Sequence, residues 1–416
     1  MDLRSLRNQE APQQRRTEWA GPAAFALAVL GIAAVATTTA RLVPGDLWYT
    51  HPGDHHIYRW MAENGPSTFH VAPWGWRPLV PWLARALPTS VTAGFQVATT
   101  LCLVATAFLT YLIGRGFEFR RPEALAGVVL FLGLGYAVKF NLYDFWLPDA
   151  TAFVFLALAV VLIQRRADVP LALCLAVGVM AKESIFLVLA LYYGLRSSRV
   201  FDVQVAKRAA LVALPAVAVL VALRLGIDAR NGDAFYLRSF PDAIWLNVKR
   251  LPSYTFWPVL SETVSARAAA LVPTVSRALS AFGLLVGGLA VVGAATKRQL
   301  ALRFTPFLML VFAQLLFAGD TQRLVVFAFP AVIVLALAGG VSLCRWARAS
   351  TVWLLLVALA FLALSIASGD HEWQPQPVWQ VALVAFALAA LGMRRHTRRP
   401  TELPRQPDSP VSQFLF

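Results

Sequence analysis

The sequence predicts an all-α protein: a polytopic bundle of about 10 full transmembrane helices, a broken, re-entrant hairpin and surface helices in the first outer loop. Hydrophobic residues make up 58% of the 416-residue chain and charged residues 14%, against about 25% charged residues in an ordinary soluble domain. Apolar runs of roughly 16 to 22 residues, enough to cross a hydrocarbon core, recur along the chain. A soluble core could not absorb so much apolar surface, so the composition excludes a set of soluble domains.

The full spans are expected wherever such an apolar run occurs. The first run, from Trp19, is too long for the core of a cleavable signal peptide, and no clear small-residue cleavage site follows it, so we expect it to be retained. The predicted spans lie near residues 19–40, 91–114, 124–139, 149–164, 209–226, 278–296, 304–318, 324–343, 351–367 and 378–393.

The basic residues predict the orientation of these spans. The net charge of +15 is gathered in short clusters between apolar runs, a pattern typical of membrane topology and not of nucleic-acid binding. Alternate loops are basic, and the others are acidic or neutral, which predicts cytoplasmic tails at residues 1–18 and 397–416 around a transmembrane domain at 19–396. We expect the chain to lie in the plasma (inner) membrane. The clusters are Arg115, Arg120 and Arg121; Arg165 and Arg166; Lys297, Arg298 and Arg303; Arg345 and Arg348; and Arg394, Arg395, Arg398 and Arg399.

Residues 170–195 do not fit a simple span. They are apolar except for Lys182 and Glu183, and both flanks are basic. A single span here would place the basic cluster at the C-terminal end of the last span on the outer side. Two short helices that meet near Lys182 and Glu183 keep both flanks on the cytoplasmic side, so we predict a broken hairpin that turns within the membrane or near its outer surface.

Two long loops are expected on the outer face. The first, at 41–90, contains two surface helices: Ile57, Trp60 and Met61 share one helical face in the first helix, and Leu79, Leu83 and Leu87 share one in the second. The second loop, at 228–276, shows no strong periodicity.

The first outer loop holds the first group of candidate functional residues. Asp54 is followed by His55, His56 and Tyr58, and His51 precedes it. Asp54 suits the N-terminal cap of the helix that follows, and a capping residue can also be catalytic. His51, Asp54 and His55 are candidate ligands for a divalent metal, although their spacing matches no closed metal site.

Four further places carry charged residues at the outer side of the predicted bundle. Arg77 lies among tryptophans and prolines. The tryptophans suit an anchor at the membrane interface, and Arg77 on this rigid turn is also well placed to hold a lipid phosphate. Asp149 suits the start of a span, whereas Asp144 has no such structural role. Charges near the hydrocarbon are costly unless they are paired or used. The remaining candidates are Lys182 and Glu183 in the hairpin, which we expect to pair with other residues, and Asp320 and Arg323 in a short outer loop.

These motifs resemble those of the GT-C class of membrane glycosyltransferases, which use polyprenyl-phosphate-linked sugars, and the mannosyltransferases among them in particular. The stretch from Asp54 to Gly65 looks like their pattern of Asp, Tyr, Ile-Ala and Gly, and the stretch from Ala72 to Pro81 is similar to the Pro-rich segment that follows it. The pair Lys182–Glu183 and the combination of Arg323 with Pro330 also resemble recurring features. The likeness consists of short motifs between residue 1 and about 343. The chain departs from the class in having no sizeable soluble domain after the last span and no clear acidic pair in the first loop.

The resemblance implies an inverting transfer of a sugar to an acceptor at the outer face. Asp54 would act as the general base. Arg323, with Arg77 or Lys182, would hold the leaving lipid phosphate, and Asp144 or Asp149 would orient the acceptor or a metal. The substrate-binding residues implied in this way are Tyr58, His55, Arg77, Asp144, Asp149, Lys182, Glu183, Asp320 and Arg323.

Two other classes of function stay open at this point. A transporter or lipid flippase would also combine many spans with intramembrane charges, but secondary transporters usually contain an internal repeat, and none is evident here. A membrane scaffold would tolerate neutralisation of the outer charges. The expected partners are the polyprenyl-phosphate-linked sugar donor and membrane lipid, with no nucleic acid. No cofactor is indicated with certainty, and a divalent metal remains possible. Cys102, Cys174 and Cys344 are scattered and form no disulfide or metal spacing.

Overall fold

A computed structural model describes residues 20–39, 54–65, 74–197, 199, 201–227, 264–314, 321–368 and 377–397. Within these ranges the side chains of residues 20, 54, 55, 264–279, 321 and 391–397 are not described. Most of both predicted tails, residues 228–263 of the second outer loop, and residues 41–53 and 66–73 of the first outer loop lie outside these ranges.

The described residues are mainly helical, with no strand among them. The elements are α3 (Ala20–Thr39), α5 (Asp54–Asn64), η3 (Trp74–Trp76), α6 (Leu79–Ala86), α7 (Val91–Gly116), α8 (Arg121–Leu132), α9 (Lys139–Tyr143), α10 (Asp149–Gln164), α11 (Asp168–Gly178), η4 (Glu183–Leu187), α12 (Val188–Arg196), α13 (Val203–Gly226), α15 (Val264–Thr296), α16 (Arg298–Ala313), α17 (Thr321–Val325), η7 (Val326–Ala328), α18 (Phe329–Trp346), α19 (Val352–Ala367) and α20 (Pro377–Thr397).

Within the described ranges, four helical segments are long and apolar enough to cross a membrane: Gly21–Thr39, Val91–Gly116, Val203–Gly226 and Gln322–Trp346. Other apolar helices are shorter, among them Asp149–Gln164 with 16 residues and Val352–Ala367 with 16 residues. The set is compatible with a multi-pass membrane protein. The predicted count of about 10 full spans is not confirmed, because several apolar runs form helices shorter than a hydrocarbon core of about 30 Å requires.

The clearest difference concerns the expected span at 124–139. The helix α8 ends at Leu132, residues 133–138 form turns, and the five-residue helix α9 follows. At Gly133 the helix passes so close to the ring of Phe361 on α19 that a Cβ atom would lie 2.6 Å from it. The apolar composition continues through this break because the turn is itself buried, so hydropathy alone could not reveal it.

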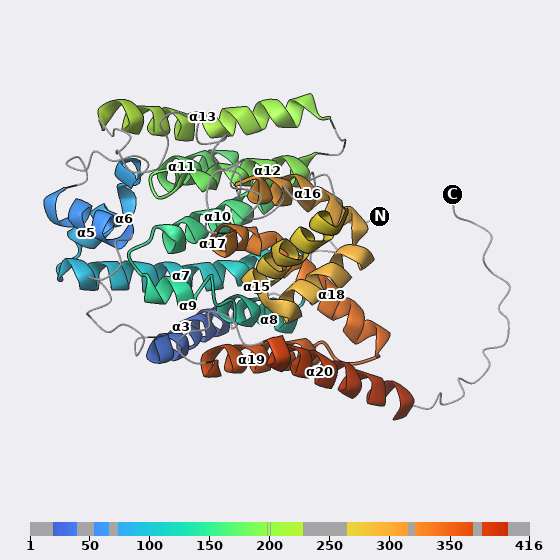
Figure 1. Cartoon of the computed structure of the whole chain (residues 1–416). Coiled ribbons are helices and arrows are strands. Elements are labelled where there is room, and N and C mark those ends of the chain that lie inside the picture. Colours follow the sequence, from blue (N-terminus) through green and yellow to red (C-terminus); the bar gives the residue numbers. More distant parts are fainter. Residues whose placement is uncertain are drawn as a thin grey trace, which may run out of the picture.

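The helices pack around a core formed mainly by α7, α8, α10, α15 and α18. In Figure 1, α13 lies along one edge of the bundle, α19 and α20 lie along the opposite edge, and α5 and α6 gather at one end. The helices α15 and α18 pack closely because glycines lie where the two helices touch: a Cβ at Gly339 of α18 would lie 2.0 Å from the carbonyl oxygen of Leu289 on α15. The segment that contains α18 is almost completely buried, so it is the central helix among the four long ones.

The helical break predicted near Lys182 and Glu183 is present. The helix α11 ends at Gly178, Lys182 has an extended backbone (φ −162°, ψ 136°), and η4 starts at Glu183. The start of α11 lies beside the end of α12: Arg196 at the end of α12 is 3.3 Å from Asp168 at the start of α11. The segment from α11 to α12 is therefore a helical hairpin with both flanks at one end, as the basic residues on each side had indicated.

The two expected helices of the first outer loop are also present, as α5 and α6, and each turns toward the protein a face other than the apolar face noted in the sequence. In α5, Tyr58 and Met61 are buried, whereas Trp60 is 52% exposed. In α6, Val80 and Ala84 are buried and Leu83 is exposed. Small residues determine which face of α6 is buried, because Gly94 on α7 allows the backbone at Ala84 to approach so closely that no Cβ would fit between them.

Candidate functional site

A buried carboxylate lies at the centre of a group of charged side chains. Asp149 is completely buried in the first turn of α10. Lys182 Nζ donates a hydrogen bond to one of its oxygens, and Arg323 Nε donates to the other. The three residues come from α10, the hairpin break and α17, and they are separated by 33 and 174 positions in the chain. Both oxygens of Asp149 are thus occupied by cations.

Local backbone structure explains how these side chains reach one another. Asp149 follows Pro148 and begins α10, where the helix dipole favours a negative charge. The extended backbone of Lys182 interrupts the helical path, so its side chain leaves the hairpin turn and lies against the ring of Phe327, with Nζ 4.7 Å from the ring centroid. Phe327 belongs to η7, directly after the short helix that carries Arg323.

A second ion pair lies next to the first. Nε of Arg77 donates a 3.0 Å hydrogen bond to one oxygen of Glu183, and Nη2 of Arg77 forms an ion pair with the same oxygen at 2.9 Å. The other oxygen, Oε1 of Glu183, is inaccessible to solvent and has no hydrogen-bond partner among the described residues. Buried carboxylate oxygens are normally satisfied. This oxygen can therefore accept a hydrogen bond from a bound molecule.

The first outer loop is attached to the hairpin break at this point. The backbone N–H of Leu79 donates to the carbonyl oxygen of Met180 at 3.2 Å. Tyr58 of α5, which is completely buried, interacts with Arg77. Burial acts to lower the pKa of Arg77, but the carboxylate of Glu183 and the hydroxyl of Tyr58 outweigh burial, and the pKa is raised. Arg77 is therefore a permanent cation that ties α5, η3 and the hairpin together.

We call these five residues, Arg77, Asp149, Lys182, Glu183 and Arg323, the charged cluster. It contains three cations and two carboxylates, so one positive charge is in excess. Each side chain of the cluster is at least three quarters buried, so the excess charge acts in a medium of low effective dielectric constant. Such a site favours an anion.

The charged cluster unites many of the residues that the sequence singled out. It brings together five of them in direct ion pairs, and Tyr58 adjoins it. The expectation that Lys182 and Glu183 pair with other residues is confirmed. Asp144 is half-buried at the end of α9 and leads through Phe145–Pro148 to Asp149. His51 and Asp320 lie outside the described residues, and so do the side chains of Asp54 and His55, although Asp54 begins α5.

Sequence reasoning missed three polar residues near this end of the bundle. Ser184, next to Glu183, donates a 2.6 Å hydrogen bond to Gln314 at the end of α16. Arg224 in the last turn of α13 lies over the ring of Trp76, with 4.5 Å between its guanidinium carbon and the ring centroid. A signal was present for two of them, because Gln314 and Arg224 are polar residues near the ends of apolar runs.

The metal prediction rests on residues that the structure does not describe. Among the described residues, no group of three or more His, Cys, Asp or Glu side chains is placed to hold a metal ion. His51 and the side chains of Asp54 and His55 fall outside that statement.

Comparison with known proteins adds no further identification. The chain matches no protein-family profile and no curated protein sequence. The function is therefore inferred from the charged cluster and from the residue patterns themselves.

Proposed function

We propose that the protein is a membrane glycosyltransferase of the GT-C type, which transfers a sugar from a polyprenyl-phosphate donor to an acceptor at the outer face of the membrane. One observation supports this function most directly: a buried cluster with an excess positive charge lies where the first predicted outer loop meets the turn of the hairpin. A lipid-linked phosphate is an anion delivered from the bilayer, and a cation-rich cluster at the end of apolar helices suits it.

In this proposal the cations stabilise the leaving group. As the bond between the sugar C1 and the phosphate oxygen breaks, its electron pair moves to the phosphate, and negative charge accumulates there. Arg323 and Lys182 are held in place by Asp149, and Arg77 is held by Glu183. Asp149 acts as a positioning residue, since it is completely buried and each of its oxygens is bonded to a cation.

The acceptor hydroxyl attacks C1 from the opposite side, which inverts the configuration, and a base must take its proton. We assign that role to Asp54. Position 54 is four residues before Tyr58 on α5, so the two positions share one face of the helix, and Tyr58 adjoins Arg77. The base and the phosphate-binding cations would therefore lie on neighbouring parts of one site. The acceptor proton goes to the carboxylate, and the new C1–O bond replaces the broken one.

The proposal includes the finer topology. We infer about 10 full spans with the hairpin α11–α12 inserted from the cytoplasmic side, both chain ends in the cytoplasm, and the charged cluster at the outer face of the inner membrane. The contact between Asp168 and Arg196 supports a hairpin whose flanks share one side. The basic flanks favour the cytoplasm for that side.

The test measures sugar transfer by the purified chain in lipid nanodiscs. The donor is polyprenyl-phosphate-mannose with a radiolabelled sugar, and the acceptors are water and an extract of envelope lipids. Asp54→Asn and Arg323→Gln should each lower kcat by at least about 100-fold, because each removes a group that acts in the transition state. Arg59→Gln is the matched control, since Arg59 lies on α5 but is 45% exposed and pairs with Glu63.

Two results would end the proposal. The first is full transfer by Asp54→Asn, which would remove Asp54 as the base. The second is that the native protein releases no sugar but moves the intact donor across the membrane of proteoliposomes, which would identify a lipid flippase. Retention of the native elution volume and melting temperature separates both results from misfolding.

A further inference from the structure

A second cation-rich site lies at the other end of the hairpin from the charged cluster. A cavity of about 170 Å³ is lined by Arg166, Tyr192, Leu195, Arg196, Val205 and Arg208. We call it the arginine pocket. Lys182 and Glu183 lie at the turn of the hairpin, whereas this pocket lies where the start of α11 and the end of α12 meet, so the two sites are separate.

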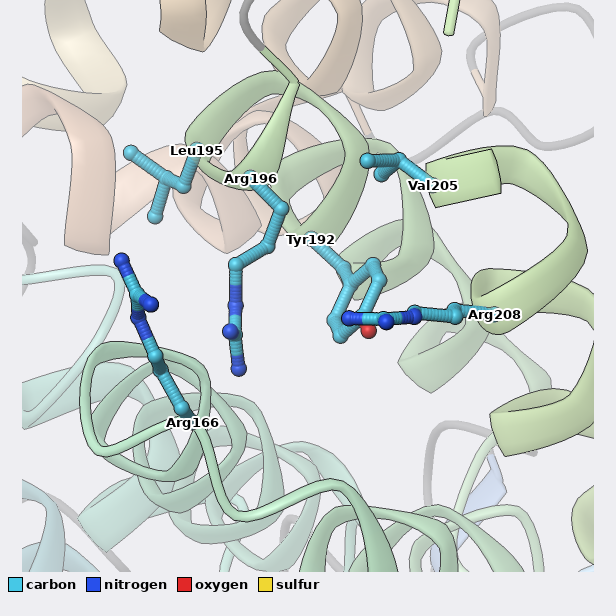
Figure 2. A pocket seen from close by; sticks show the side chains of 6 residues that line it. All are labelled: Arg166, Tyr192, Leu195, Arg196, Val205 and Arg208. Carbon is cyan, nitrogen blue, oxygen red and sulfur yellow. The ribbon is translucent and has the colours of Figure 1, made fainter. Parts of the chain in front are cut away.

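Three elements supply the arginines of the pocket. Arg166 follows the end of α10, Arg196 ends α12, and Arg208 lies on α13. Figure 2 shows their side chains extending into the same open space, with Tyr192 between Arg196 and Arg208. Tyr192 is buried, and Arg196 lies above its ring at 5.4 Å from the centroid, so the ring forms a fixed wall of the pocket.

The pocket contains more positive charge than its neighbours balance. Asp168 balances part of this charge: it forms the ion pair with Arg196 and a hydrogen bond with Tyr192. Within the described part of the chain, neither Arg166 nor Arg208 forms an ion pair. Arg196 Nε is inaccessible to solvent and has no acceptor among the described residues. Buried donors are normally satisfied, so this N–H indicates a missing acceptor.

The chemistry of the missing acceptor follows from the donors. Guanidinium groups present planar pairs of N–H donors that match the oxygens of a phosphate group. Three of them around one cavity suit a group with several anionic oxygens better than a single carboxylate. We propose that the arginine pocket binds a phosphate group.

The surroundings of the pocket favour a lipid as the carrier of this phosphate. Val169, Phe201 and Val203, close in sequence to pocket residues, are 74%, 89% and 64% exposed. Exposed apolar side chains beside a basic site are typical of a surface that contacts lipid acyl chains and headgroups together. The basic flanks place the pocket on the cytoplasmic side in the proposed topology, so an anionic lipid of that leaflet fits it.

Binding by the full-length protein in detergent tests the proposal in two arms. Equilibrium dialysis with radiolabelled inorganic phosphate measures the free anion, and native mass spectrometry with dioleoyl phosphatidic acid, against phosphatidylcholine, measures the lipid. The double variant Arg166→Gln/Arg208→Gln should weaken binding by at least about tenfold in each arm where the native protein binds, because it removes two charge-assisted contacts. Both side chains are exposed, so the fold should persist.

Arg298→Gln/Arg345→Gln is the matched control. It removes the same charge from exposed positions outside the pocket and should bind like the native protein. If the pocket variant loses binding only to phosphatidic acid, the pocket is a site for a lipid headgroup. If it loses binding to both probes, the pocket is a site for any phosphate group. The proposal is overturned if the native protein binds neither probe, if the pocket variant binds as tightly as the native protein, or if the control is equally weakened. None of these readouts depends on sugar transfer.

Discussion

Replacement of Asp149 by Asn isolates the energetic role of the charged cluster. In the native protein the carboxylate of Asp149 is completely buried between Lys182 and Arg323, whose side chains are only 7% and 13% exposed. The amide keeps the size of the side chain but leaves two buried cations facing each other without a counter-charge. Removal of one partner of a buried ion pair costs about 3–5 kcal/mol.

The structure reduces this expected loss of stability somewhat. The ring of Phe327 continues to stabilise the ammonium group of Lys182, by about 0.5–2 kcal/mol, and Arg323 retains slight contact with solvent. We therefore expect Asp149→Asn to lower the free energy of unfolding by about 3 kcal/mol. Lys182→Met should cost less, because Asp149 keeps its bond with Arg323. The loss of unfolding free energy in the double variant should be smaller than the sum of the two single losses by about 1–3 kcal/mol, because the double variant contains one fewer unpaired cation.

The assay is unfolding of the purified protein in mixed micelles by sodium dodecyl sulfate, followed by tryptophan fluorescence. Glu63→Gln is the control: it breaks the ion pair between Arg59 and Glu63, whose side chains are 45% and 41% exposed. An exposed pair on one helix contributes less than about 1 kcal/mol. The reasoning is refuted if Asp149→Asn unfolds at the same detergent fraction as Glu63→Gln, or if the losses in the double variant simply add.

Three further predictions concern the helix packing and the topology. Gly339→Ala should destabilise the protein by about 2 kcal/mol or more, because its Cβ would lie 2.0 Å from a carbonyl oxygen of α15. Gly288 has open space around it, so Gly288→Ala should be neutral or stabilising by up to about 1 kcal/mol. Equal melting temperatures of the two variants would contradict the packing of α15 against α18. Arg165→Cys and Arg199→Cys, in a background without the native cysteines, should react with an impermeant maleimide from the same side of the membrane, and reaction from opposite sides would disprove the hairpin. Thr99→Val should cost about 1–2 kcal/mol in the same unfolding assay, because the buried hydroxyl donates a 2.7 Å hydrogen bond to a backbone carbonyl 46 residues away; an unchanged free energy would show that this carbonyl finds another donor.

Patterns within short stretches of sequence predicted much of the secondary structure. The apolar runs indicated helices, and the pair Lys182–Glu183 between basic flanks indicated a break that the structure contains between α11 and η4. The start of α10 at Asp149 and the two helices of the first outer loop were also predicted from local signals. These features depend on residues within a few turns of one another, and helical periodicity and capping report on that range.

Other features depend on close packing between distant helices. The end of α8 at Leu132 was missed, because the turn after it is as apolar as the helix itself. The faces that α5 and α6 turn toward the protein could not be read from the sequence for a related reason: small residues can face the protein while large apolar side chains face outward. Leu83 is exposed and Ala84 is buried for this reason.

The sequence by itself determined the class of this protein, an all-helical chain with apolar segments compatible with several passages through a membrane, and it identified which charged residues needed an explanation. Only the tertiary structure decided their partners: Lys182 and Arg323 with Asp149, and Arg77 with Glu183. Apolar character belongs to each segment, so it can be read locally. The choice of an ion-pair partner depends on which side chains meet when helices 33 to 174 residues apart pack together, because a buried charge is stable only where an opposite charge reaches it.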